Sequence, residues 1–190
     1  MADTTAPEPT RRDFLYIATG GVAAVGAGLA AWPFIDQMNP SSAVLALASI
    51  DVDLSPVQVG QQVVFNWRGH PLFVRRRTPQ EIAEAKAVDV ASLPDPIARN
   101  ANLPDNAPAT DADRAAKDPQ WLIVVGVCTH LGCTPTVSTP QVPQGEYGGW
   151  LCHCHGSQYD TAGRIRKGPA PQNLAVPPYV FSSPTKVKVG

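Results

Sequence analysis

An excess of charge of either sign is absent from this sequence. Its 190 residues carry 15 Lys and Arg against 16 Asp and Glu, a formal net charge of −1. The chain therefore lacks the basic surplus that proteins use to bind nucleic acid, or a membrane surface by charge alone, and we expect no nucleic-acid partner. No internal repeat is visible either. A chain of this length is expected to form one main globular domain plus an additional segment, and its 20 prolines and 15 glycines favour a loop-rich domain built from strands.

Cysteine and histidine are scarce, with four of each, and most of them cluster. All four cysteines and three of the four histidines lie in two segments, residues 128–133 (CTHLGC) and 152–157 (CHCHGS). Each segment offers one Cys and one His spaced to reach a common centre, and each has one further cysteine. The two pairs are Cys128 with His130 and Cys152 with His155. Mixed sulfur and nitrogen ligands indicate a metal site, and the two remaining thiols indicate a disulfide.

Two kinds of metal centre are compatible with such ligands. A tetrahedral zinc ion accepts two cysteines and two histidines, and structural zinc sites usually combine a C-x2–4-C half with an H-x3–5-H half. In this sequence both halves place Cys before His, with one and two residues between them, so the halves are pseudo-equivalent. That symmetry favours a two-metal cluster in which one iron takes both thiolates and the other takes both imidazoles. Zinc is the alternative.

The motif CTHLGC followed by CxCHGS resembles the Rieske [2Fe–2S] protein of cytochrome bc complexes. In Rieske centres two histidines replace two cysteines on one of the irons, and the reduction potential is raised. The resemblance implies one [2Fe–2S] cluster, with Cys128 and Cys152 on the inner iron and His130 and His155 on the outer iron. It also implies that His155 and His130 face the quinol, and that His155 accepts the quinol hydrogen bond, so that proton and electron transfer are coupled.

The resemblance also pairs the two remaining cysteines, Cys133 and Cys154, in a disulfide. One position departs from the family, which usually has Pro where this chain has His153. The imidazole of His153 is a third candidate ligand close to the site. The register of the family motif nevertheless assigns the ligand role to His155.

Two hydrogen-bond donors follow the second motif. Ser157 and Tyr159 match family positions that donate to a bridging sulfide and to a ligand thiolate. Donors to sulfur spread the additional negative charge of the reduced state and so raise the reduction potential. A loop serine and a packed tyrosine without this role are the alternative.

Four other residues are expected to surround the cluster. Gly132 and Gly156 allow tight turns and a close approach of the backbone. Leu131 either packs against the protein or forms an apolar cap that meets the quinone pocket. Pro169 belongs to residues 168–171 (GPAP), which resemble the family's proline loop over the cluster. Two prolines stiffen such a loop because their φ angles are fixed.

Charge is absent from residues 14–35, a run of 22 residues that is long enough to span a membrane at about 1.5 Å per residue. The overlapping residues 10–15 (TRRDFL) resemble a twin-arginine export signal, and residues 36–67 contain no Lys or Arg. This asymmetry places residues 1–13 in the cytoplasm and the following domain on the periplasmic side of a bacterial inner membrane. A buried helix of a soluble protein is the alternative.

Residues 36–48 link the apolar segment to the domain. They occupy the position of the family's hinge, which lets the head move between the quinol pocket and a c-type cytochrome; a passive linker is the alternative. Residues 46–48 (ALA) are similar to a signal-peptidase site. They lie more than ten residues beyond the apolar run, so we expect the anchor to be retained rather than a mature chain that begins at Ser49.

Residues 49–190 are expected to form the head, a mainly β, Rieske-type antiparallel domain with its cluster-binding part at about residues 121–178. The expected strands are residues 48–53, 61–67, 72–77, 121–127, 148–151, 158–160 and 185–189.

Three segments of the head are expected to lie outside its sheets. Residues 78–87 should form a helix that begins with a capping box between Thr78 and Glu81. The polar, proline-broken residues 94–119 predict a surface excursion rather than core. The basic residues before the proline loop predict a solvated basic face. These are Arg164, Arg166 and Lys167.

The resemblance as a whole implies the iron–sulfur subunit of a bacterial ubiquinol–cytochrome c oxidoreductase, a proton-translocating enzyme of respiratory or photosynthetic electron transport. The implied partners are a cytochrome b subunit, a c-type cytochrome subunit, ubiquinol and membrane lipid, within a dimeric complex. Three alternatives stay open: the Rieske subunit of a plastoquinol-oxidising cytochrome bf complex, the small subunit of an enzyme such as arsenite oxidase, and a membrane-tethered zinc-binding interaction module.

Overall fold

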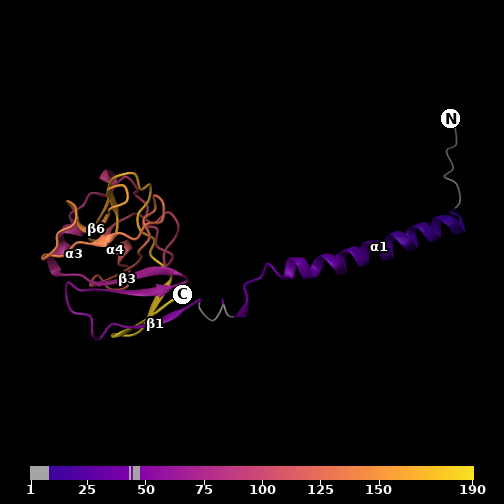
Figure 1. Cartoon of the computed structure of the whole chain (residues 1–190), viewed down its shortest axis with the longest axis horizontal. Helices are drawn as coiled ribbons and strands as arrows, with labels where there is room; N and C mark the ends of the chain where they lie inside the picture. Colours follow the sequence, from indigo (N-terminus) through magenta and orange to yellow (C-terminus); the bar gives the residue numbers. More distant parts are fainter. Residues whose placement is uncertain (1–8, 43, 45–47) are drawn as a thin grey trace. The chain divides into compact units, whose positions relative to one another are not determined.

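The computed structural model describes residues 9–42, 44 and 48–190. The chain divides between residues 45 and 46 into two compact units, an amino-terminal unit with one long helix and a head of strands and loops (Figure 1). The expected fold class, a mainly β head preceded by one long apolar helix, is confirmed.

Helix α1 (Arg11–Asp36) dominates the amino-terminal unit. It begins at a capping box, in which Thr10 Oγ1 accepts a hydrogen bond from the Asp13 N–H at 3.3 Å and Asp13 Oδ2 accepts one from the Thr10 N–H at 2.8 Å. The expected span, residues 14–35, lies within α1. The helix is long and apolar enough to cross a membrane, with a mean hydropathy of 1.7 over 18 residues. None of its residues is buried within the unit, so its apolar side chains remain available to lipid or to other helices.

The expected linker, residues 36–48, is described only in part. Helix α1 ends at Asp36, and the chain turns there with hydrogen bonds from the Gln37 N–H to the Pro33 carbonyl at 3.0 Å and from the Met38 N–H to the Ile35 carbonyl at 3.1 Å. Residues 43 and 45–47 lie outside the described residues, and with them most of the sequence that is similar to a signal-peptidase site.

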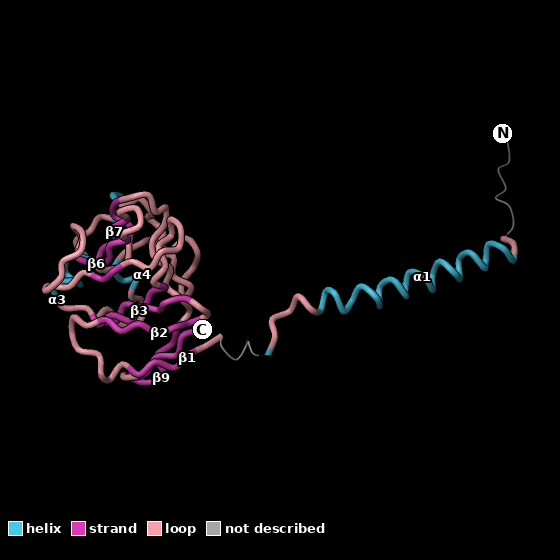
Figure 2. The backbone as a smooth tube through the Cα atoms, in the orientation of Figure 1, coloured by secondary structure: helices cyan, strands magenta, loops and turns pink. Residues whose placement is uncertain are grey.

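Three antiparallel sheets form the head (Figure 2), with strand orders β1–β10–β9, β2–β3–β4 and β5–β6–β7–β8. The strands are β1 (Ile50–Asp53), β2 (Gln62–Trp67), β3 (His70–Arg76), β4 (Trp121–Val125), β5 (Thr136–Val137), β6 (Gly148–Cys152), β7 (Ser157–Asp160), β8 (Ile165–Lys167), β9 (Tyr179–Ser183) and β10 (Lys186–Val189). All seven expected strands are present, and their ends agree within two residues. Strands β5, β8 and β9 were not expected.

Three short helices lie between β3 and β4 in the sequence. They are α3 (Pro79–Lys86), the 3-10 turn η1 (Val90–Ser92) and α4 (Asp111–Arg114). The expected capping box of α3 is confirmed, because Thr78 Oγ1 accepts from the Glu81 N–H at 3.1 Å and Glu81 Oε2 accepts from the Thr78 N–H at 2.9 Å.

The core joins the second sheet to the third. Phe73 on β3 stacks on Trp150 of β6 with ring centroids 6.1 Å apart. Gly126 directly follows β4, and a side chain there would meet the Phe73 ring at 2.3 Å, so only glycine permits this packing. The apolar run of β4 is buried, as its sequence predicted, and it leads directly to the first cysteine motif.

The expectation that residues 94–119 form a surface excursion is wrong for much of the segment. Its buried residues are Asp95, Ala98, Asn100, Ala109, Asp111, Arg114 and Ala115. Polar groups are buried at low cost only where they are bonded, and here they are. Arg77, directly after strand β3, forms an ion pair with Asp111, and Arg114 donates to main-chain carbonyls. The segment therefore packs into the head.

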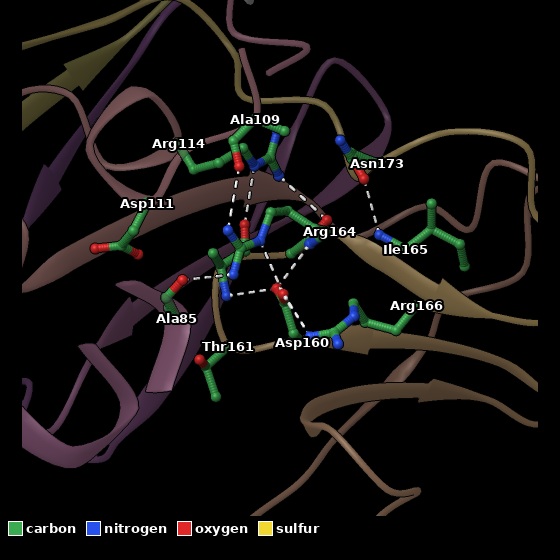
Figure 3. Close-up of polar contacts among 12 residues, drawn as sticks. Ala85, Ala109, Asp111, Arg114, Asp160, Thr161, Arg164, Ile165, Arg166 and Asn173 are labelled. Carbon is green, nitrogen blue, oxygen red and sulfur yellow. Dashed lines mark hydrogen bonds and ion pairs between the residues drawn. The ribbon is translucent and has the colours of Figure 1, made fainter. Parts of the chain in front are cut away.

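The expected solvated basic face is also wrong for Arg164, which is fully buried (Figure 3). Its Nε donates to Asp160 Oδ2 at 2.8 Å, and its Nη1 donates to the carbonyl of Ala109 at 3.1 Å. Arg166 is half-buried and Lys167 is exposed, so the basic run is only partly in solvent.

Replacing Arg77 by Met tests whether the buried ion pairs hold this segment in place. The change leaves the Asp111 carboxylate buried without its cation, so we expect a loss of about 3–5 kcal/mol in the free energy of unfolding. The double variant Arg77→Met/Asp111→Leu, which removes both charges, should regain most of that loss. Thermal and urea unfolding followed by circular dichroism measure both effects. Equal stability of the single variant and the wild type would contradict the expectation.

Candidate metal centre

Two loops carry the cysteine and histidine motifs. Ligand loop 1 (residues 128–133) follows β4 and leads to β5, and ligand loop 2 (residues 152–157) joins β6 to β7. In loop 1 the Gly132 N–H donates to the Cys128 carbonyl at 2.9 Å, and in loop 2 the Gly156 N–H donates to the Cys152 carbonyl at 2.9 Å. Both glycines have positive φ, 83° and 77°, which residues with a side chain rarely adopt. The two loops therefore share one turn geometry, as their similar motifs predicted.

A disulfide joins the two loops. The expected bond between Cys133 and Cys154 is present. It leaves Cys128 and Cys152 as free thiols, and both are buried. The sulfur of Cys152 also lies within 4.8 Å of the two disulfide sulfurs. These three sulfurs do not form a metal site of their own, because two of them are bonded to each other.

The imidazoles of His130 and His155 lie against one another. Their ring centroids are 4.6 Å apart and the rings are nearly perpendicular, at 89°. His155 is exposed and His130 is half-buried. His153 is exposed and takes no part in this ring pair. Two of the three imidazoles in the loops thus meet, and they are the two that the motif register assigns as ligands.

The two free thiols differ in acidity. Burial alone would raise the pKa of the Cys128 thiol, but hydrogen bonds, chiefly from the Tyr159 hydroxyl and the main-chain N–H of His130, outweigh burial and lower it. Burial raises the pKa of Cys152, and the adjacent Cys128 raises it further. Cys128 is therefore the thiol that ionises first, and this difference arises from the donors around it.

Tyr159 and Ser157 lie where the sequence placed donors. The Tyr159 hydroxyl donates to Cys128 Sγ at 3.3 Å, and burial together with this contact raises its own pKa above the ordinary range. Ser157 is fully buried, and its hydroxyl also contributes to lowering the pKa of Cys128. Neither side chain is merely a surface loop residue or a packing residue.

The proline loop (residues 168–171) covers ligand loop 2. Gly168 has a φ of 101°, and a side chain there would lie 2.6 Å from the Ser157 Cα, so glycine is required at this close approach. The Ala170 N–H donates to Ser157 Oγ at 3.1 Å. Pro169 itself is exposed, so it does not fill space in the core. Leu131 at the tip of loop 1 is 72% exposed, which excludes packing in the core for this side chain.

Sequence reasoning missed Thr129, which ties the end of the proline loop to ligand loop 1. Thr129 Oγ1 donates to the Gln172 carbonyl at 2.7 Å, and the Gln172 N–H lies 3.2 Å from the same oxygen. The Thr129 N–H also lies 3.3 Å from the Tyr159 hydroxyl oxygen. The available signal was a small hydroxyl residue between two candidate ligands.

The residues fit a [2Fe–2S] group. Two buried thiols, one with a lowered pKa, and two adjacent imidazoles provide the mixed ligand set of a Rieske centre. Hydroxyl donors and a close-packed main chain surround the thiols, as expected of a site that favours extra negative charge on sulfur.

Comparison with known proteins agrees with this chemistry. Residues 1–41 match the family model "Ubiquitinol-cytochrome C reductase Fe-S subunit TAT signal", and residues 99–179 match the model "Rieske [2Fe-2S] domain". The chain is 53% identical over 189 residues to the "Ubiquinol-cytochrome c reductase iron-sulfur subunit" of Rhodospirillum rubrum, with 100% of this chain and 96% of the relative covered. The chain belongs to the ubiquinol–cytochrome c reductase iron–sulfur subunit family.

A second relative of the same name is similarly close, and one solved structure is more distant. The subunit of the same name from Bradyrhizobium diazoefficiens is 50% identical over 188 residues, with 98% of each chain covered. A solved structure entitled "Hyperthermophilic respiratory Complex III" contains a chain that is 27% identical, with a TM-score of 0.47, over 90% of this chain and 98% of that chain. The family assignment rests on the relatives and does not depend on that structure.

Family membership decides several of the open alternatives. The Rieske domain match confirms one [2Fe–2S] cluster over zinc. The signal match at residues 1–41 confirms the twin-arginine signal, and together with helix α1 it fits a membrane-anchored subunit. The names of the relatives agree with the ubiquinol–cytochrome c type rather than with the cytochrome bf or arsenite oxidase types. The assignment of individual residues to the two irons stays a prediction.

Replacing Tyr159 by Phe removes the hydroxyl that donates to Cys128 Sγ and leaves the ring in place. A hydrogen bond that strengthens on reduction by about 1 kcal/mol corresponds to about 40 mV for one electron, so we expect the reduction potential of the cluster to fall by about that amount. Redox titration of the full chain measures the shift. Tyr179→Phe, which removes a buried tyrosine hydroxyl in the first sheet, is the control and should leave the potential unchanged. An unaltered potential in the Tyr159 variant would refute the role of this contact.

Proposed function

We propose that this chain is the iron–sulfur subunit of a ubiquinol–cytochrome c oxidoreductase, and that it takes one electron from ubiquinol and passes it to a c-type cytochrome. The observation that carries the proposal is the pair of disulfide-linked loops, which bury two thiols and bring the imidazoles of His130 and His155 together near the surface. The names of the relatives at 50% identity or more support the same activity.

In the proposed arrangement Cys128 and Cys152 bind the inner iron, and His130 and His155 bind the outer one. When bound, a [2Fe–2S] cluster with these ligands accepts one electron more readily than an all-thiolate cluster, because two neutral imidazoles leave the oxidised site without net charge. The burial of both thiols and the exposure of His155 support this order of inner and outer ligands.

The protein's own groups give the site two further properties. Tyr159 and Ser157 donate toward the Cys128 sulfur and stabilise added negative charge there. The exposed ring of His155 is free to accept a hydrogen bond from a hydroxyl of the quinol, and in this proposal it takes the quinol proton as the electron is transferred. Leu131 adds an exposed apolar side chain beside His130, as a surface that meets a quinone pocket needs.

We place the chain in the inner membrane of a bacterium, with residues 1–13 in the cytoplasm and the head in the periplasm. The absence of Lys and Arg from residues 36–67 supports this orientation. The anchor is retained, lies among lipid and contacts a cytochrome b subunit in a dimeric complex. Residues 36–48 act as the hinge that lets the head reach both the quinol site and the c-type cytochrome subunit; part of this hinge lies outside the described residues.

Paramagnetic resonance of the reduced full chain, recorded as a function of applied potential and pH, tests the proposed function. We expect the signal of a reduced [2Fe–2S] cluster with a midpoint between about −150 and +300 mV, falling as pH rises. Zinc gives no such signal. Failure to detect iron and acid-labile sulfide in freshly isolated protein would overturn the proposal.

Replacing His155 by Ala removes one proposed iron ligand, so we expect loss of the cluster's visible absorption and of ubiquinol oxidation in membranes. The matched control is His153→Ala, which removes an exposed imidazole from the same loop. The control should keep an absorbing cluster. The opposite result, loss in the His153 variant and retention in the His155 variant, would reverse the ligand assignment.

A further inference from the structure

Arg114, at the end of helix α4, is a buried cation that binds main-chain carbonyls from three separate segments. Its Nε donates to the Ala162 carbonyl at 2.9 Å, its Nη2 donates to the carbonyls of Leu174 at 2.6 Å and Gly163 at 3.2 Å, and its Nη1 donates to that of Ala98. Its side chain is fully buried, and in the described part of the chain it forms no ion pair. Burial lowers its pKa to about 10, so it is charged at neutral pH.

The turn between β7 and β8 is shaped to admit this guanidinium. Gly163 in that turn has a φ of 72°, and a side chain there would lie 2.8 Å from Arg114 Nη2. The turn is otherwise built around Asp160, whose Oδ1 accepts from the N–H groups of Ala162 at 2.9 Å and Arg164 at 3.0 Å (Figure 3). Arg114 therefore docks onto a turn that has its own hydrogen bonds, and it can hold a second segment against that turn.

The segment that Arg114 holds is the chain that leaves the proline loop. Asn173 immediately precedes Leu174, and its N–H donates to Asp95 Oδ2 at 2.9 Å. The carbonyl of Ala175, the residue after Leu174, accepts a hydrogen bond from the Val125 N–H at 2.8 Å. Val125 is the last residue of strand β4 and lies three residues before Cys128. Leu174 is fully buried in the same apolar cluster as Cys128 and Cys152. The chain at the end of the proline loop is thus bonded both to residues 95–114 and to ligand loop 1.

We propose that Arg114 is a positioning residue of the redox site: it fixes the end of the proline loop, and through the Gln172–Thr129 hydrogen bonds it holds that loop against ligand loop 1. The proposal rests on the proposed function for its redox consequence. Its structural part rests only on the contacts of Arg114, Leu174, Gln172 and Thr129. The buried segment 95–114 then serves the metal centre although none of its residues is a candidate ligand.

Arg77 provides a matched control. It is also buried, and it binds the same segment through Asp111 and the adjoining Pro119 carbonyl, at 3.0 Å from its Nε. Its hydrogen bonds among the described residues do not reach the proline loop or the β7–β8 turn. A Lys in place of either arginine keeps the positive charge and removes the fork of donors. Comparing the Arg114→Lys and Arg77→Lys variants therefore distinguishes an effect on the position of the proline loop from a general loss of stability and from a loss of charge.

The experiment is amide hydrogen exchange on the full chain carrying its cluster, with the resonance spectrum and potential recorded on the same samples. In Arg114→Lys we expect the amides of Ala170 and Gln172 to exchange at least roughly tenfold faster, because charge-assisted hydrogen bonds to carbonyls are lost. The β4 amides should keep their wild-type rates. The reduced-state spectrum should broaden and the potential should shift. Arg77→Lys should change none of these readouts.

Several outcomes would overturn the proposal. They are equal exchange at Ala170 and Gln172 in the two Lys variants, faster exchange throughout the head, and faster exchange with an unchanged spectrum and potential. If the Arg114→Lys variant does not accumulate, the Gly163→Ala variant is tested with the same readouts. Its added methyl group displaces the Nη2 atom of Arg114, although the arginine itself is retained. A wild-type chain without a cluster signal would refute the proposed function. The exchange comparison would still test whether Arg114 holds the proline loop against ligand loop 1.

Discussion

The bond between Cys133 and Cys154 is the constraint on which the site depends, because the two ligand loops come from different parts of the chain. Ligand loop 1 extends from the end of β4, in the second sheet, whereas ligand loop 2 is the turn between two strands of the third sheet. Each loop closes on itself through its own glycine turn. The disulfide spans 21 residues, and in the chain-entropy model a crosslink of that size contributes about 3 kcal/mol by restricting the unfolded chain. It holds the two loops together, so that the thiols of Cys128 and Cys152 stay side by side.

Layers of buried polar contacts then fix the surroundings of the loops. Thr129 and Ser157, which belong to the loops, bond the residues of and next to the proline loop, and Tyr159 donates to the thiol of Cys128. Buried arginines lie behind them. Arg164 binds the Asp160 carboxylate and the Ala85 carbonyl, and Arg114 binds the Leu174 carbonyl. Such groups carry a desolvation cost that their hydrogen bonds offset, and their directional bonds specify one arrangement more sharply than apolar packing does. A redox site whose potential depends on hydrogen bonds to sulfur requires that kind of precision.

The sequence predicted the residues of the metal centre better than it predicted the buried contacts that hold those residues in place. The spacing of Cys and His within two short segments was sufficient for the ligand loops and for two remaining cysteines that could form a disulfide, whereas the donor positions of Ser157 and Tyr159 followed from the resemblance to the Rieske family. The role of residues 94–119 was not predictable in this way. The ion pair of Arg77 with Asp111 joins residues 34 apart, and the contact of Arg114 with Leu174 joins residues 60 apart. Polar composition and prolines correctly indicated irregular structure there, but whether a charged residue is buried depends on partners that a local pattern does not reveal. Strands β5 and β8 were missed because two and three residues are too few to show an alternating pattern.

Mixed coordination by two thiolates and two imidazoles is the central claim, and pulsed paramagnetic resonance of the reduced full chain with 15N-labelled histidine tests it most directly. The account predicts couplings from two histidine nitrogens, and these couplings persist unchanged in the His153→Ala variant. A reduced cluster that shows no histidine nitrogen coupling would contradict it.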